Sequence, residues 1–285
     1  MSAEASTLRR FDATAAWDAA RAPLLSILIP TFDHDVVPLC AELLAGVARL
    51  PVGEVEILVL IDGNPALAGQ SALLDIAERL ALPAALALAA NNLGRSMARN
   101  ALAHLARGRF LQFLDADSMP DSADFVSQTV NALRAVTEDV VICGGRTGTR
   151  MARAPRDARL FERHSEKREW ISAEARNQDP AACFLSANFV VSRRLFLAEP
   201  FDETFRGWGW EDTEWALRIS AHASIRHIDN TVSHMEHHRD AVWLGRLGRA
   251  AENYALLFAR HPDAVRKHRI FPLIRKLQPL NGAPA

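Results

Sequence analysis

The sequence predicts an α/β protein with a mixed, mainly parallel sheet flanked by helices and followed by a C-terminal helical extension. Apolar runs of strand length alternate with segments of helical spacing, the connections between them are short, and polar residues gather directly after the runs. Such alternation builds βαβ units with right-handed crossovers, which place helices on both faces of the sheet. The carboxyl ends of parallel strands share one edge, so we expect the functional site there.

The individual elements follow from periodicity and from the residues that interrupt it. We expect strands at residues 24–29, 55–61, 84–89, 109–114, 140–143 and 183–191. We expect helices at residues 36–50, 66–80, 96–106 and 125–136. The Ala-rich residues 1–22 are interpreted as a helical or frayed leader. Residues 146–180 are rich in Arg, Glu and Asp and indicate a surface helix with a loop, either a lid over a site or a solvated excursion.

Composition excludes several classes of protein. The 285 residues are 49% hydrophobic and 24% charged, which is ordinary for a globular protein with a sizeable core. A net charge of -1 provides no basic field to recruit nucleic acid. Three widely spaced cysteines suggest reduced thiols in a cytoplasmic setting. No apolar run is long enough for a membrane span, and the first residues lack the pattern of a secretory signal.

Two carboxylates end the fourth expected strand. The apolar run at residues 110–114 stops at Asp115-Ala116-Asp117. Like charges this close are costly unless a cation lies between them. Oxygen ligands favour Mg²⁺ or Mn²⁺, ions that share their coordination shell with substrate phosphates. The pattern therefore predicts a divalent cation bound together with a diphosphate, with a solvated turn that caps the next helix as the structural alternative.

Other nucleotide and metal signatures are absent. There is no GxGxxG after the first strand and no GxxxxGK[ST], which disfavours dinucleotide and P-loop proteins. HExxH and PCxxC are also missing, which disfavours zinc hydrolases and deaminases. A nucleotidyltransferase would share the sheet and the metal, but we expect it to carry a Gly- and Lys/Arg-rich loop after the first strand. Residues 31–35 (TFDHD) are acidic instead.

An ordered set of motifs resembles family 2 glycosyltransferases of the GT-A fold, over roughly residues 24–238. The segments that carry the resemblance are residues 26–32 (SILIPTF), 60–63 (LIDG), 92–100 (NLGRSMARN), 115–117 (DAD), 201–203 (FDE), 207–212 (GWGWED) and Arg218. The last three segments also resemble the acceptor block of galactosyltransferase and chondroitin-polymerase-like domains. The resemblance implies an inverting, metal-dependent transfer of a sugar from a nucleotide-diphosphate sugar, expected to be UDP-linked, to a hydroxyl group of a carbohydrate or a lipid-linked saccharide.

The resemblance also assigns roles on the donor side. The cofactor it implies is Mn²⁺ or Mg²⁺, with Asp117 as the direct ligand, Asp115 near the ion or the ribose, and His234 as a further ligand. Glu236 follows His234 as the family's acid would, and His237 is the alternative ligand. Contacts to the donor are expected from Pro30, Thr31, Asp33, Asp62, Asn92, Gly94, Arg99, Asp115 and Ala116. Asp62 would accept a hydrogen bond from the base, and its alternative is a turn residue before Gly63.

On the acceptor side, Asp212 is the expected general base and Glu211 is expected to hold the acceptor. Both acids open an expected helix, where the helix dipole alone would favour them. Trp208, Gly209 and Trp210 are expected to bind the acceptor. Two positions depart from the family pattern: Ile61 replaces the first Asp of DDG, and Trp210 replaces the second Gly of GWGGED. The QxxRW signature of processive synthases is absent, which favours transfer of a single sugar by a soluble enzyme.

These expectations divide the chain into a leader (1–22), a GT-A catalytic domain (23–240) and a basic helical extension (241–285). The donor half spans about 23–145 and the acceptor half about 181–240. Residues 241–280 carry eight Lys or Arg against Glu252 and Asp263. This extension either lies on an anionic membrane, which would attach a cytoplasmic protein to its inner face, or packs on the catalytic domain, which we favour. A catalytically silent nucleotide- or carbohydrate-binding module remains the alternative function, and the oligomeric state is not predicted.

Overall fold

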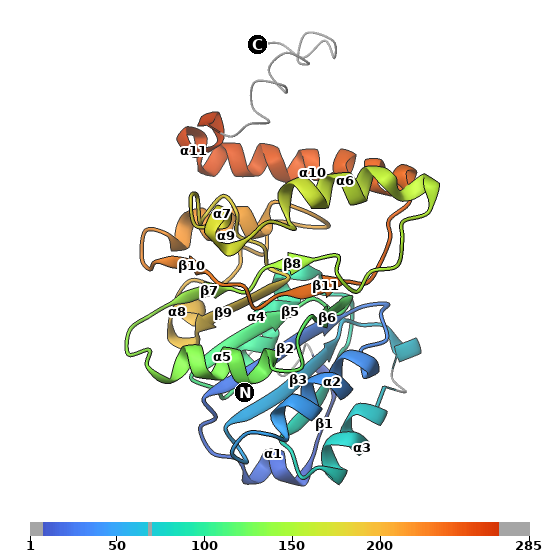
Figure 1. Ribbon diagram of the computed structural model, residues 1–285, viewed down its shortest axis with the longest axis vertical. Coiled ribbons are helices and arrows are strands. Elements are labelled where there is room, and N and C mark those ends of the chain that lie inside the picture. Colours follow the sequence, from blue (N-terminus) through green and yellow to red (C-terminus); the bar gives the residue numbers. More distant parts are fainter. Residues whose placement is uncertain (1–7, 68–69, 268–285) are drawn as a thin grey trace.

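A mixed eight-stranded sheet forms the centre of the protein (Figure 1). The computed structural model describes residues 8–67 and 70–267. The strand order is β1-β4-β3-β2-β5-β9-β7-β10, with β4, β3, β2 and β5 mutually parallel. The bounds are β1 Leu8–Ala13, β2 Leu25–Thr31, β3 Val55–Ile61, β4 Ala84–Ala89, β5 Phe110–Leu114, β7 Val141–Cys143, β9 Asn188–Ser192 and β10 Ile225–His227. The predicted fold class is confirmed.

Helices cover both faces of this sheet because side chains alternate along each strand. In β2, Ile27 and Ile29 pack on one face with α2, α3 and α5, whereas Leu28 packs on the other face with α1, α4, α8 and α9. The helix bounds are α1 Ala15–Ala19, α2 Val37–Val47, α3 Ala72–Arg79, α4 Arg95–Leu105, α5 Phe125–Arg134, α8 Arg193–Ala198 and α9 Glu211–Ile219. Strands β3 and β4 have the predicted bounds. The predicted helices from α2 to α5 are all present; α2, α3 and α5 are shorter than predicted, and α4 is displaced by one residue.

The N-terminal segment differs from its prediction as a helical or frayed leader. Strand β1 pairs antiparallel with β4 at the edge of the sheet, with Phe11 opposite Ala87. Thr14 then begins α1, and its hydroxyl accepts a hydrogen bond from the backbone N–H of Trp17. The alternation of β1 is weak because an edge strand is largely exposed, and the Ala-rich residues after it dominated the sequence pattern. Within residues 8–22, the leader therefore contributes a strand to the main sheet.

A second, three-stranded sheet was not predicted. Its order is β6-β11-β8, from Ser118–Pro120, Val232–His234 and Arg146–Thr147. These strands have two or three residues each, which is too short for periodicity to reveal them. The predicted strand at 183–191 begins later, at Asn188, and runs antiparallel between β5 and β7.

Helices α6 (Arg159–Arg168) and α10 (Asp240–Arg260) lie side by side at the end of the molecule opposite α1 and α3 (Figure 1). The short helices α7 (Ala173–Arg176) and α11 (Pro262–Lys267) complete this end. Tyr254 and Leu257 of α10 pack with Phe205, so residues 240–267 pack on the preceding α/β domain, the alternative that we favoured. No helix in the described part of the chain is both long and apolar enough to cross a membrane.

Candidate functional site

Polar residues from four parallel strands converge at the carboxyl edge of the sheet, as predicted. Asp62 follows β3, is 5% exposed, and accepts backbone hydrogen bonds from Leu93 (2.6 Å) and Gly94 (3.0 Å). Burial raises the pKa of Asp62, and these two hydrogen bonds oppose the rise. Gly63 has φ of +72°, and a Cβ there would lie 2.2 Å from the Asn91 carbonyl carbon, so only glycine fits. Asp62 thus holds the loop between β4 and α4.

The loop after β2 is ordered by its own hydrogen bonds. The Thr31 hydroxyl donates to the carbonyl oxygen of His34 (2.8 Å), and the His34 Nδ1 pairs with Glu236 Oε1 (3.0 Å). That bond, more than the opposing effect of burial, raises the pKa of His34. Glu236, expected near the metal, is therefore placed on His34. Asp33 is exposed, and so is Phe32, which lies 46% exposed beside it.

The two acids after β5 have different partners. Asp115 Oδ1 accepts from Arg99 Nη2 at 2.6 Å, and Arg99 is 2% exposed. Asp117 lies two residues on, beyond Ala116, and faces His234 instead. The division of labour predicted between the two aspartates thus has a counterpart in their contacts, although their roles in binding remain predictions.

Asp117 Oδ2 lies 2.9 Å from His234 Nε2, and Asp117 Oδ1 lies 3.3 Å from Arg146 Nη2. Burial alone would raise the pKa of Asp117, but the His234 hydrogen bond and the Arg146 charge outweigh it and hold the pKa well below its usual value. Arg146 also lies 3.5 Å from Glu169. Sequence reasoning missed Arg146, because its strand β8 gave no periodic signal.

The small sheet brings Asp117 and His234 together. Ser118 in β6 stands opposite His234 in β11, and the Met235 N–H donates to the Asp117 carbonyl oxygen at 2.8 Å. Asp121 reinforces the sheet by accepting hydrogen bonds from the hydroxyls of Thr147, Thr231 and Ser233. His237, the alternative ligand, is directed elsewhere: its Nε2 lies 2.7 Å from the Ala152 carbonyl oxygen.

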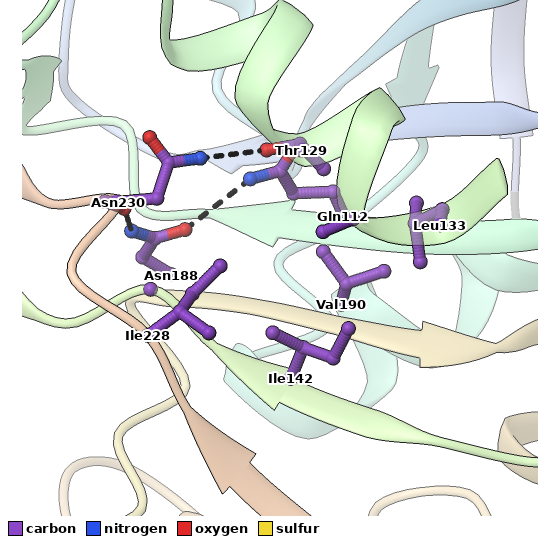
Figure 2. Close-up of a pocket in the computed structure, with 10 residues that line it drawn as sticks. Gln112, Thr129, Leu133, Ile142, Asn188, Val190, Ile228 and Asn230 are labelled. Atoms are coloured by element: carbon purple, nitrogen blue, oxygen red, sulfur yellow. Dashed lines mark hydrogen bonds between the residues drawn. The ribbon is translucent and has the colours of Figure 1, made fainter. Parts of the chain in front are cut away.

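A buried amide network fixes the approach to β11 (Figure 2). Gln112 of β5 donates to Asn188 of β9, Asn188 donates to the Asn230 carbonyl oxygen, and Asn230 donates to the Thr129 hydroxyl. These bonds join two central strands and α5 to the segment that precedes β11. The main sheet therefore fixes the position of the segment that leads into β11 and to His234.

The acids predicted to act on the acceptor begin α9. Glu211 is 5% exposed, and its Oε1 lies 3.8 Å from Arg95 Nη1. Burial, followed by the negative charge of Glu211, raises the pKa of Asp212 to about 7. Sequence reasoning also missed Arg95, which lies near both acid pairs: Glu211 and Asp212, and Asp115 and Asp117. Burial would lower the pKa of Arg95, but the surrounding carboxylates, Glu211 foremost, raise it.

The two predicted acceptor tryptophans are half-buried against α10. Trp208 contacts Trp243 edge-on with ring centroids 5.1 Å apart, and Trp210 contacts Tyr254 at 4.8 Å. Trp210 has φ of +74°, the left-handed conformation that glycine would adopt without strain. Trp210 therefore adopts a backbone conformation that favours glycine, and its side chain attaches the loop to α10. Asn253 of α10 also donates to the Gly209 carbonyl oxygen at 2.9 Å.

Asn100, at the end of the NLGRSMARN segment, connects that segment to the FDE segment at residues 201–203 by hydrogen bonds. Its Nδ2 donates to the Phe201 carbonyl oxygen (2.9 Å) and to Glu203 Oε1 (3.1 Å), and its Oδ1 accepts from the Phe201 N–H. Asn100 thus fixes the start of the loop that leads to α9. Trp215, by contrast, is fully buried in the core and is unavailable to a sugar.

Residues 146–180 contact the site, which excludes the interpretation as a solvated excursion. Phe161 of α6 packs against His234 with ring centroids 5.1 Å apart, and also against Trp243 of α10. Trp170 lies against Gly148, where a Cβ would come within 2.5 Å of the indole ring. The motion of this segment as a lid remains a prediction.

Comparisons with known proteins agree with this arrangement. Residues 26–201 match the model of a family described as Glycosyl transferase family 2. A curated relative, an uncharacterized glycosyltransferase named EpsJ from Bacillus subtilis (strain 168), is 34% identical over 122 residues, which is 43% of this chain. The matched segment spans 34% of that relative's length.

Solved structures share the fold. The mannosyltransferase PcManGT from Pyrobaculum calidifontis has a TM-score of 0.56 at 19% identity, over 89% of this chain and 68% of its own. Glucosyl-3-phosphoglycerate synthase from Mycobacterium tuberculosis has a TM-score of 0.53 at 17% identity, over 86% and 81%. S. aureus TarS 1-349 has a TM-score of 0.52 at 16% identity, over 74% of this chain and 60% of its own. The family model ends at residue 201, so the acceptor block beyond it remains a prediction.

Proposed function

The chain belongs to glycosyl transferase family 2, and on that premise we propose that it is an inverting, metal-dependent enzyme. It transfers a hexosyl or N-acetylhexosaminyl group from a UDP-linked sugar to a hydroxyl of a carbohydrate or lipid-linked acceptor, in polysaccharide or glycoconjugate synthesis. The observation that carries the proposal is the pairing of Asp117 with His234, together with the acid pair of buried Glu211 and partly buried Asp212. Fold neighbours crystallised with UDP-GlcNAc, or with UDP and Mn²⁺, support the choice of donor.

The residues around Asp117 fit a divalent cation that shares its ligands with a substrate. Two adjacent ligands of an octahedral ion at about 2.1 Å lie about 3 Å apart. Asp117 Oδ2 and His234 Nε2 are separated by 2.9 Å. No group of three or more His, Cys, Asp or Glu side chains suited to an ion occurs among the described residues, so diphosphate and water would complete the shell. When bound, the ion would offset the charge of the leaving diphosphate.

Asp212 would remove the proton from the acceptor hydroxyl as that oxygen attacks the anomeric carbon from the face opposite the diphosphate. A pKa near 7 suits a general base that works near neutral pH. Attack from the opposite face inverts the anomeric centre. Glu211 would orient the acceptor, with the Arg95 guanidinium beside it.

The donor would lie along the carboxyl edge of the sheet, in contact with Pro30, Thr31, Asp33, Asn92 and Gly94. Arg99 would hold the Asp115 carboxylate in place, and Asp115 would accept a hydrogen bond from a ribose hydroxyl of the donor. Asp62 would act mainly through the loop whose N–H groups it binds, since both of its oxygens already accept hydrogen bonds.

Binding and turnover together test this proposal. We expect Mn²⁺ to strengthen binding of UDP-sugars, measured by calorimetry, and we expect slow release of UDP in the absence of an acceptor. Asp212→Asn should abolish turnover and preserve donor binding. If the wild-type protein binds a UDP-sugar but never releases UDP, the silent binding module is correct. If it binds no UDP- or GDP-sugar, the proposed function is wrong.

We further propose that α10 contacts an anionic membrane where lipid-linked acceptors reside. Leu244 and Leu247 are 55% and 42% exposed, and Arg249 lies exposed beside them. Exposed apolar residues next to basic ones are typical of helices at a membrane surface. The double change Leu244→Glu with Leu247→Glu should reduce co-sedimentation with vesicles of anionic lipid. Equal binding of variant and wild type would exclude this surface.

A further inference from the structure

A cavity of about 160 Å³ lies between the start of α4 and the loop that leads to α9. We call it the α4 cavity, and its walls include Gly94, Ser96, Met97, Glu203, Phe205 and Arg206. Neither the acids after β5 nor those at the start of α9 belong to its lining. The α4 cavity is therefore separate from the proposed metal and base, but it borders the proposed donor site, because Asn92 and Gly94 line it as well.

One wall of the α4 cavity presents hydrogen-bond donors without partners. The first N–H groups of a helix have no acceptor within the helix, and the residue before α4, Gly94, has no side chain to cap them. Ser96, in the first turn, is 3% exposed, and its hydroxyl has no hydrogen-bond partner among the described residues. Leaving a buried hydroxyl without a partner costs about 1–3 kcal/mol, so this wall is suited to a ligand that accepts hydrogen bonds.

The opposite wall carries one charge of each sign. Arg206 is exposed, and no ion pair of its guanidinium occurs among the described residues. Its backbone is fixed, because the Arg206 carbonyl oxygen accepts a hydrogen bond from Asn253 of α10 at 2.9 Å. Glu203 is also exposed, and its Oε1 is occupied by Asn100. The positive end of α4 together with Arg206 outweighs the single carboxylate, and favours an anion on the side away from Glu203.

We propose that the α4 cavity is an oxyanion subsite that binds one phosphate or carboxylate group of the acceptor. The first-turn N–H groups and the Ser96 hydroxyl donate to the anion, and Arg206 forms a charged hydrogen bond with it. Glu203 accepts from a neighbouring hydroxyl of the same molecule. This assignment rests on the proposed function only where it calls the ligand an acceptor; binding of the anion itself requires no turnover.

Titration of the metal-free protein with inorganic phosphate, followed by the backbone amide resonances of Arg95, Ser96 and Met97, tests the subsite. We expect a saturable shift of these three resonances. Arg206→Gln should weaken the apparent affinity at least about fivefold, and Ser96→Ala should weaken it severalfold. Glu203→Gln should strengthen it, because a repelling charge is removed. Arg79→Gln, which removes an exposed charge from α3 on the other face of the sheet, is the matched control and should leave the affinity unchanged.

Opposite effects of Arg206→Gln and Glu203→Gln are the signature of an anion in the α4 cavity. A parallel titration with glucuronate distinguishes the two sources: a shift with phosphate alone assigns a phosphate group, and a shift with glucuronate alone assigns a carboxylate. Absence of any shift with either anion, or equal loss in Arg206→Gln and Arg79→Gln, would overturn the proposal. Saturable anion binding by a protein that releases no UDP would retain the subsite while the proposed function fails.

Discussion

The raised pKa of Asp212 predicts that activity falls steeply in mild acid. Burial, and then the charge of Glu211, raises the pKa of Asp212 from its ordinary value of 3.8 to about 7. A base acts only when it is deprotonated, so about half of the molecules would be competent at pH 7, about a tenth at pH 6 and about a hundredth at pH 5. An ordinary aspartate would remain ionised over this whole range.

Glu211→Gln separates the two causes of that shift. The change removes the nearby negative charge and keeps the size of the side chain, so the pKa of Asp212 should fall and the acid limb of the profile should move to lower pH. The assay is kcat/KM between pH 5 and 8.5, with donor affinity measured at each end so that loss of binding is not mistaken for loss of the base. A flat profile in the wild type, or an acid limb that stays in place in Glu211→Gln, would refute the assignment of Asp212.

Three further changes test the surrounding structure. Asp117→Asn or His234→Ala should weaken Mn²⁺ binding in the presence of UDP on the order of 10–100-fold or more, measured by electron paramagnetic resonance. Asp139→Asn, which alters a half-buried acid bonded to Arg194, is the control and should leave Mn²⁺ binding unchanged. Arg176→Met should lower the free energy of unfolding, measured in urea, by about 1–3 kcal/mol, because the buried guanidinium donates hydrogen bonds to three carbonyl oxygens. An unchanged urea midpoint of unfolding would mean that other donors replace it. Asn100→Ala should raise the KM for the acceptor more than the KM for the donor, and equal effects on both would contradict a role confined to the acceptor loop.

The sequence predicted the parallel core well because its strands are continuous apolar runs. The seven residues of β3 are all buried, and a turn at Asp62-Gly63 ends the strand where the pattern stops. Helix bounds were less accurate: residues 66–80 were predicted as one helix, but a 3₁₀ turn at Pro65–Leu67 precedes α3, which begins at Ala72. Local turn geometry, which side-chain periodicity does not encode, accounts for that difference.

Contacts between distant segments could not be predicted in the same way. The motif analysis proposed Asp117 and His234 as ligands, but nothing in the spacing indicated that Arg146 would lie against Asp117. Arg95 occupies a variable position within a recognised motif, so only the placement of Glu211 opposite it reveals its setting. The contacts of Trp208 and Trp210 with α10 were also not predicted, because nothing in the sequence indicates where that helix packs, and their role at the acceptor remains a prediction.

The ladder between β6 and β11 has a consequence for how this protein is made. The family match ends at residue 201, whereas His234 comes from the chain beyond it. A nascent or truncated chain that ends before β11 would contain every strand of the parallel core and both aspartates after β5, and would still lack half of the proposed ion site. Metal affinity would therefore report on completion of the polypeptide, and a fragment chosen by the family boundary would be a poor substitute for the whole protein.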